Sequence, residues 1–176
     1  YQQSAKVTPD RLAKDPRNAL LSRGARFRLS AEIIRDQALA TSGLLTQKLG
    51  GPSVMPPQPP GVWKSTYSGE KWKDATGPDR YRRGLYTYLK RTSPYPALTT
   101  FDAGSGEVCQ IRRIRTNTPL QALITLNDTT FLEAAGALSK KMRSLEHGFR
   151  LVLIRSPLRK ELVRLQALYS TMETVS

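Results

Sequence analysis

A proline-dense segment divides the chain into two parts. Five of the chain's twelve prolines lie between Gly50 and Gly61, at Pro52, Pro56, Pro57, Pro59 and Pro60. Proline fixes its own backbone angle and lacks an N–H donor, so neither a helix nor a central strand can run through this segment. We expect an extended, polyproline-like spacer here. Regular structure must therefore be built from the sequence on either side.

Helix-start signals precede the spacer. Thr8-Pro9-Asp10 combines an N-cap hydroxyl with proline at the first helical position, and Asp15-Pro16 repeats the pattern for a second short helix ending at Gly24. Ser30 is expected to cap a longer helix that ends at Gly50-Gly51. The apolar residues of that helix recur at three- and four-residue spacing: Ile33, Ile34, Ala38, Thr41, Leu44, Leu45 and Leu49.

Helix signals return in the second half. Thr118-Pro119 predicts a helix to residue 126, and Asn127-Asp128 starts another that runs to residue 142. Residues 149–154 and the stretch after Ser156-Pro157 predict two more. Residues 84–91 suit a short strand followed by a turn at 93–96, and residues 107–115 fit a strand or a turn of helix. The prediction is a mainly α, irregular helical domain with a long Pro/Gly-rich loop and room for one small β-strand pair.

The length and the first residue bear on domain organisation. A chain of 176 residues is the usual size of one domain. It opens at Tyr1 without Met or a basic-then-apolar leader, so we expect a fragment of a larger multidomain protein. Within this single domain of residues 1–176, the expected parts are a helical region (1–49), a Pro/Gly/aromatic loop (50–80), a central block (81–128) and a second helical region (129–176).

Charge and cysteine content narrow the classes of function. The net charge of +14 favours an anionic partner, but the basic residues are spread along the chain without a run of five or six. Cys109 is the only cysteine and His147 the only histidine, which argues against a disulfide, a metal site and a Cys-x-x-Cys-His haem attachment. We expect a semi-buried thiol and a surface imidazole. No stretch approaches the roughly 18 apolar residues of a membrane span.

The segment after the prolines mixes aromatic and cationic side chains. Trp63, Tyr67 and Trp72 lie among lysines and arginines in a Gly-containing loop. Such rings can stack on bases or sugars while the cations contact phosphate or sulfate. The alternative is that the loop anchors itself by burying these rings on the domain. The sequence leaves both interpretations open.

The central block resembles a known family. The strongest motif is Arg112-Arg113-Ile114-Arg115-Thr116-Asn117-Thr118-Pro119-Leu120-Gln121-Ala122-Leu123 with Leu126-Asn127-Asp128. Further matches are Tyr81-Arg82-Arg83-Gly84-Leu85-Tyr86, Thr100-Phe101-Asp102-Ala103, Glu107-Val108-Cys109 and Phe149-Arg150-Leu151. These residues resemble planctomycete-specific domain one, the C-terminal domain of unknown function in planctomycete cytochrome C proteins. Residues 81–128 would be its core motif.

The resemblance implies a setting and no activity. It implies an exported parent protein, periplasmic or in the cell envelope, with a haem-binding cytochrome-like region and another domain upstream of this C-terminal portion. Haem would then belong to that upstream region, and this segment would carry no cofactor. The expected partners are the upstream domains of the same parent chain. The family supplies no catalytic residue to carry over.

A dense polar block gives the one candidate site. Guanidinium groups suit carboxylates, phosphates or sulfates, so we consider an anion site formed by Arg82, Arg83, Arg112, Arg113, Arg115, Asn117 and Gln121. The carboxylate candidates are Asp102, Glu107 and Asp128, of which Asp102 and Glu107 would be the acid and base of a catalytic site. The alternative is that these groups satisfy one another inside the fold.

Three functions remain open at this stage. The first is a non-catalytic interaction domain of an exported, cytochrome-linked protein. The second is a polyanion-binding module for acidic or sulfated polysaccharide, with nucleic acid the less favoured polymer, because the charge is dispersed. The third is part of a polysaccharide-active enzyme. The sequence leans away from an enzyme for this domain alone.

Overall fold

The computed structural model describes residues 3–63, 69–104 and 106–173. This part of the chain is mainly α-helical, as predicted, with seven α-helices and two short 3-10 helices. The α-helices are α1 (Pro9–Lys14), α2 (Ala31–Ser42), α3 (Pro96–Thr100), α4 (Pro119–Asn127), α5 (Thr129–Lys141), α6 (Leu145–Leu153) and α7 (Arg159–Glu173). The 3-10 helices are η1 (Gly77–Tyr81) and η2 (Gly84–Tyr86).

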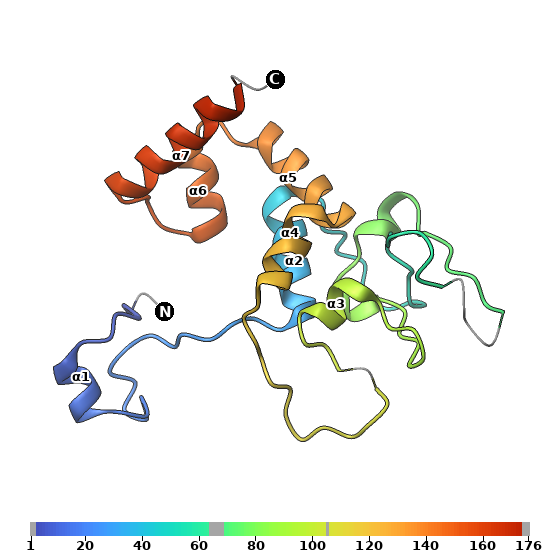
Figure 1. Cartoon of the computed structure of the whole chain (residues 1–176), viewed down its shortest axis with the longest axis horizontal. Helices are drawn as coiled ribbons and strands as arrows, with labels where there is room; N and C mark the ends of the chain where they lie inside the picture. The colour runs from blue at the N-terminus through green and yellow to red at the C-terminus, as the bar shows by residue number, and fades with distance from the viewer. Residues whose placement is uncertain (1–2, 64–68, 105, 174–176) are drawn as a thin grey trace.

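Helix α2 is the centre of the fold. It packs against α5, α3 and η2, while α4 packs against α3 and α5 (Figure 1). Ala31 and Leu39 of α2 are buried in this arrangement with Ala134 of α5 and Phe101 at the end of α3. Helices α6 and α7 pack against each other, and α1 lies at the end of an extended N-terminal segment away from α2 (Figure 1). No helix in the described ranges is long and apolar enough to cross a membrane.

Capping signals correctly predict several helix starts. The Thr8 hydroxyl accepts a hydrogen bond from the backbone N–H of Arg11, with Pro9 at the first position of α1. The Asp128 carboxylate accepts one from the backbone N–H of Thr130 at the start of α5. Local side-chain chemistry therefore fixes these boundaries before any tertiary packing is considered.

The prediction of a second short helix after Asp15-Pro16 is wrong. Residues 16–24 form turns, with Asn18 and Leu21 at positive φ. The Asp15 carboxylate accepts hydrogen bonds from the backbone N–H groups of Ala19, Leu20 and Ser22. The Asp15 side chain thus satisfies backbone N–H donors that a helix would have used. Such side-chain to backbone hydrogen bonds compete with helix formation.

The end of the long helix is also mispredicted. Helix α2 ends at Ser42, because Gly43 adopts φ 87° and its N–H bonds back to the carbonyls of Leu39 and Ala40. Glycine reaches this left-handed conformation without a Cβ penalty and closes helices readily. The apolar spacing that continues to Leu49 therefore belongs to a loop. Ser30 occupies the N-cap position without a side-chain hydrogen bond.

The predicted strand at 84–91 is replaced by η2 and a single backbone bridge. Val54 pairs with Thr87 and Thr46 pairs with Arg82, both as isolated parallel bridges. Gly84 lies so close to α2 that an added Cβ would be 2.9 Å from the Cα of Glu32. This contact holds the segment as a turn against α2. Residues 107–115 form an irregular loop with bends at 107–108 and 111–112. The expected turn at 93–96 instead leads into α3 with Pro96 at its first position.

The proline-dense segment packs on the domain. Pro56 and Pro57 are buried, and their backbone carbonyls accept hydrogen bonds from Trp72 Nε1 at 2.8 Å and from the Tyr95 hydroxyl at 2.8 Å. Burial raises the pKa of Tyr95 to about 12, so its hydroxyl keeps the proton that makes this bond. The extended spacer is therefore held by aromatic side chains that follow it in the sequence.

Candidate functional site

Arg82 lies in the interior with 1% of its surface exposed. Its guanidinium donates to the carbonyl of Pro52 at 2.8 Å and to that of Gly50, and it lies 3.8 Å from the centre of the Tyr86 ring. The two hydrogen bonds join the proline-dense segment to the central block, and the ring contact lies within that block. The structure thus places this candidate where it anchors a loop.

The aromatic side chains of the loop face one another. Trp63 is buried, and its ring centre is 5.2 Å from that of Trp72. Trp72 stacks on Tyr95 at 5.8 Å, and Tyr88 packs beside both tryptophans. Of the two interpretations of this loop, the one in which the rings pack on the domain therefore holds for Trp63 and Trp72. Tyr67 lies outside the described residues.

Asp102 connects three elements around the start of α2. Its carboxylate accepts hydrogen bonds from the Arg28 guanidinium, from the backbone N–H of Thr116 at 2.8 Å, from the Thr116 hydroxyl and from Gln121 Nε2. The Thr116 backbone bond, with Arg28 and Gln121, holds the pKa of Asp102 below its ordinary value. Asp102 therefore stays ionised and fixes the return of the 106–117 loop onto the core.

This loop places three arginines around one cavity. The cavity measures about 280 Å³ and is lined by Arg112, Arg113 and Arg115 together with Asp102 and the first residues of α2. We call it the arginine cavity. Arg113 Nη1 donates to Glu32 Oε1 at 2.6 Å, whereas Arg115 Nη1 donates to the backbone carbonyl of Arg28 at 2.9 Å. Within the described part of the chain the Arg112 side chain makes no hydrogen bond or ion pair.

The charges of the arginine cavity do not balance. Glu32 is paired with Arg113, whose guanidinium helps to lower the pKa of that carboxyl. Asp102 is paired with Arg28, which does not line the cavity. Two guanidinium groups, those of Arg112 and Arg115, are therefore left without a recorded carboxylate partner in the described residues. Planar guanidinium donors with free N–H groups are suited to a carboxylate, phosphate or sulfate.

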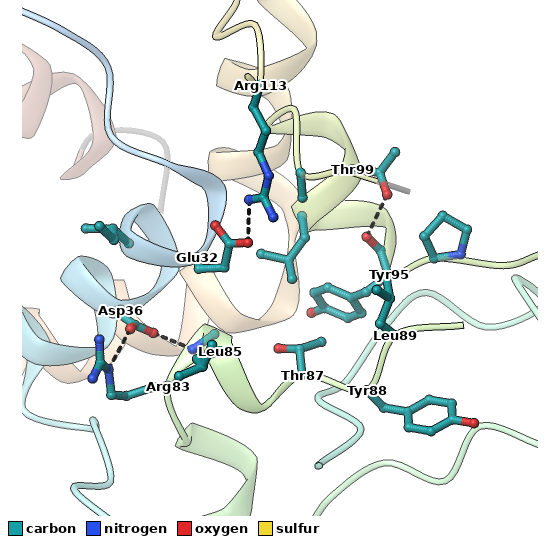
Figure 2. Close-up of a pocket in the computed structure, with 16 residues that line it drawn as sticks. Glu32, Asp36, Arg83, Leu85, Thr87, Tyr88, Leu89, Tyr95, Thr99 and Arg113 are labelled. Atoms are coloured by element: carbon teal, nitrogen blue, oxygen red, sulfur yellow. Dashed lines mark hydrogen bonds and ion pairs between the residues drawn. The ribbon is translucent and has the colours of Figure 1, made fainter. Parts of the chain in front are cut away.

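A second cavity is also lined by Glu32 and Arg113, whose ion pair is seen at its border (Figure 2). It measures about 370 Å³, and we call it the apolar cavity because Ile33, Leu85, Leu89 and Leu98 form much of its lining. Small-molecule sites in proteins commonly have volumes from about 300 Å³ upward and a largely apolar lining.

Two ion pairs border the apolar cavity. Asp36, one turn after Glu32 on α2, accepts hydrogen bonds from Arg83 Nε at 3.1 Å and from the backbone N–H of Gly84 (Figure 2). Together with Glu32 and Arg113, these groups make the border polar but balanced in charge. Of the predicted site residues, Arg83 and Arg113 line this cavity.

The other predicted site residues are dispersed. Gln121 is buried beneath Asp102 and also donates to the carbonyl of Thr100 at 3.0 Å. Asp128 caps α5, and burial raises the pKa of its carboxyl. Asn117 and Glu107 are exposed on the loop.

Cysteine, histidine and metal chemistry find little support. Cys109 is exposed, contrary to the expected semi-buried thiol, because it lies in the irregular loop before α4. His147 is half-buried on α6, where its Nδ1 accepts the backbone N–H of Arg143 at 3.1 Å. Within the described ranges no group of three or more His, Cys, Asp or Glu could hold a metal ion.

Sequence reasoning missed the α2 side of the site. Glu32 and Asp36 are four residues apart, so they share one face of a helix, and this spacing was the available signal. The leucines that line the apolar cavity come from η2, α3 and the segment between them. Their convergence depends on tertiary packing.

The comparisons with known proteins identify a family without an activity. The family model PSD1, described as protein of unknown function (DUF1553), matches residues 1–169. The chain belongs to this family. No curated protein and no solved structure matches the chain. The PSD1 match agrees with the resemblance seen in the central block, and it extends over both helical regions.

Proposed function

We propose that this PSD1 domain is a non-catalytic interaction module that binds an anionic group of its partner in the arginine cavity. The observation that carries the proposal is the charge imbalance of that cavity. Arg112 and Arg115 line it with no recorded carboxylate partner among the described residues. An anion entering there would gain charge-assisted hydrogen bonds, which are stronger than neutral ones.

The state of Asp102 supports binding rather than acid–base chemistry. Its carboxylate anchors the loop that holds the three arginines, and it already accepts hydrogen bonds from Arg28, Thr116 and Gln121. A general acid needs a proton at working pH, and the lowered pKa removes it. A carboxylate with a low pKa is also a weak base.

The proposed setting follows from the family resemblance. In this proposal the parent protein is exported and cytochrome-linked, and an upstream domain of the same chain supplies the anionic group. The net charge of +14 supports an acidic partner, because long-range attraction brings opposite charges together. Acidic or sulfated polysaccharide is the second candidate partner, since its charged groups have the same chemistry.

Binding measurements test the proposal. The purified chain is titrated with polyglutamate, an acidic polysaccharide and duplex DNA, each at low and at physiological salt. The double variant Arg112→Ala, Arg115→Ala should bind polyglutamate at least tenfold more weakly than the wild type. The matched control is Arg159→Ala, Arg164→Ala, which removes two exposed charges from α7. Equal losses in both double variants would contradict the proposal, because binding would then follow net charge alone.

A further inference from the structure

The two cavities share two lining residues. Glu32 and Arg113 line both of them, and Figure 2 shows their ion pair at the border of the apolar cavity. We propose that the two form one composite site for an acidic protein segment. An aliphatic side chain of the partner enters the apolar cavity while a neighbouring carboxylate is held by Arg112 and Arg115. This inference rests on the proposed function and names the class of partner.

The apolar cavity offers aliphatic surface that is still in water. Leu85 is 71% exposed and Leu89 is 56% exposed, although both line a concave site. Covering such side chains releases water from apolar surface, and the gain grows with the area removed from water. Concave apolar pockets that hold one anchoring side chain are typical centres of protein interfaces.

The charge pattern separates the roles of the two ends. Around the apolar cavity Asp36 is paired with Arg83, and Glu32 with Arg113, so a charged group entering there would have no unpaired opposite charge to meet. The guanidinium groups without a carboxylate partner among the described residues, those of Arg112 and Arg115, lie in the arginine cavity. A ligand that fits both ends therefore carries an apolar group and an anionic group close together. A peptide with leucine or a similar residue beside glutamate or aspartate has this pattern.

The aromatic side chains favour a peptide over a sugar. Sugar rings are commonly held on open aromatic faces, but here Trp63, Trp72 and Tyr95 pack on one another, and the ammonium of Lys90 lies 4.8 Å from the Trp63 ring centre. In Figure 2 the ring of Tyr88 points away from the other labelled residues. The groups that remain for contact in the apolar cavity are mainly aliphatic.

Three labelled octapeptides of equal length test the composite site by fluorescence anisotropy. The first holds one leucine beside two glutamates, the second replaces leucine by serine, and the third replaces both glutamates by glutamine. The first peptide should bind the whole chain about tenfold more tightly than either of the others. Leu85→Ser should remove the advantage of leucine over serine and leave the advantage of glutamate over glutamine. The matched control is Leu20→Ser, an exposed leucine in the N-terminal turns.

The outcomes distinguish the two proposals. If the leucine and serine peptides bind equally and Leu85→Ser changes nothing, the composite site is overturned while anion binding by the arginine cavity stands. Tighter binding of an acidic polysaccharide of equal charge than of the leucine peptide also overturns it, in favour of a sugar ligand. If no peptide binds and polyglutamate fails as well, the proposed function itself is wrong.

Discussion

Asp102 offers the sharpest test of how the site is held together. Its backbone has φ 62°, and its carboxylate accepts hydrogen bonds from Arg28, Thr116 and Gln121. We consider three substitutions. Asp102→Gly removes the carboxylate, and glycine adopts the left-handed backbone without strain, whereas Asp102→Ala removes the carboxylate and places a strained Cβ there. Asp102→Asn keeps one hydrogen-bond acceptor and loses the charge.

The expected losses follow from these contacts. Hydrogen bonds to charged groups contribute roughly 1.5–3 kcal/mol each, and water replaces part of what is lost at a partly exposed site. We therefore expect Asp102→Gly to lower the free energy of unfolding by about 2–4 kcal/mol. Asp102→Ala should lose about 1 kcal/mol more, which is the cost of a Cβ in the left-handed region. Asp102→Asn should lose about 1–2 kcal/mol, because Asn retains hydrogen bonding and tolerates positive φ.

Urea unfolding followed by circular dichroism at 222 nm measures these differences. The pH dependence gives an independent check, since the folded-state pKa of Asp102 lies below its ordinary value. Its contribution is present above the unfolded pKa and is lost as the pH falls through the lower folded pKa. The stability gap between wild type and Asp102→Asn should therefore close as the pH is lowered from 5 toward 2. Wild-type stability of Asp102→Gly, or equal stability of the Gly and Ala variants, would refute the reasoning.

Three further predictions concern residues outside the arginine cavity. Gly84→Ala should destabilise the fold by about 1–3 kcal/mol, because its Cβ would lie 2.9 Å from the Cα and 3.0 Å from the carbonyl oxygen of Glu32; an unchanged urea midpoint would contradict this contact. Arg82→Lys should lower the free energy of unfolding by about 3 kcal/mol, because an ammonium cannot replace a planar guanidinium among several carbonyls. A thermal unfolding temperature within a degree of wild type would count against this prediction. The Arg155 guanidinium and the backbone N–H of residue 158 lower the pKa of Glu161 to about 2. Its carboxyl should therefore titrate by NMR near pH 2, and the ion pair with Arg155 should be lost only as the pH falls through that value. A titration midpoint near pH 4 would show that the pair does not persist.

Helix starts were predictable because their causes are local. The Thr8 hydroxyl with Pro9 next to it determines the beginning of α1, although the same pattern at Asp15-Pro16 leads into turns. The end of α2 was not predictable from apolar spacing, since Leu44, Leu45 and Leu49 continue the periodicity beyond the helix. Gly43, which closes the helix, marks the end only once its left-handed backbone is known.

The site was predictable in part. Arg112, Arg113 and Arg115 are close in the sequence, so their chemistry suggested an anion site directly. The contact between Arg113 and Glu32 joins residues 81 positions apart in the sequence. It depends on Asp102, which holds the loop near α2 through Thr116. Arg82 illustrates the limit of residue type as a guide. It has the same guanidinium chemistry, but the proline-dense segment surrounds it and accepts its hydrogen bonds.

The most direct measurement is an NMR titration of the arginine Nε–Hε signals with the leucine-and-glutamate octapeptide. The account predicts that the signals of Arg112, Arg113 and Arg115 shift together and saturate with one dissociation constant, while those of Arg159 and Arg164 on α7 stay in place. Small shifts spread evenly over all arginines, without saturation, would contradict the central claim that the arginine cavity is the binding site.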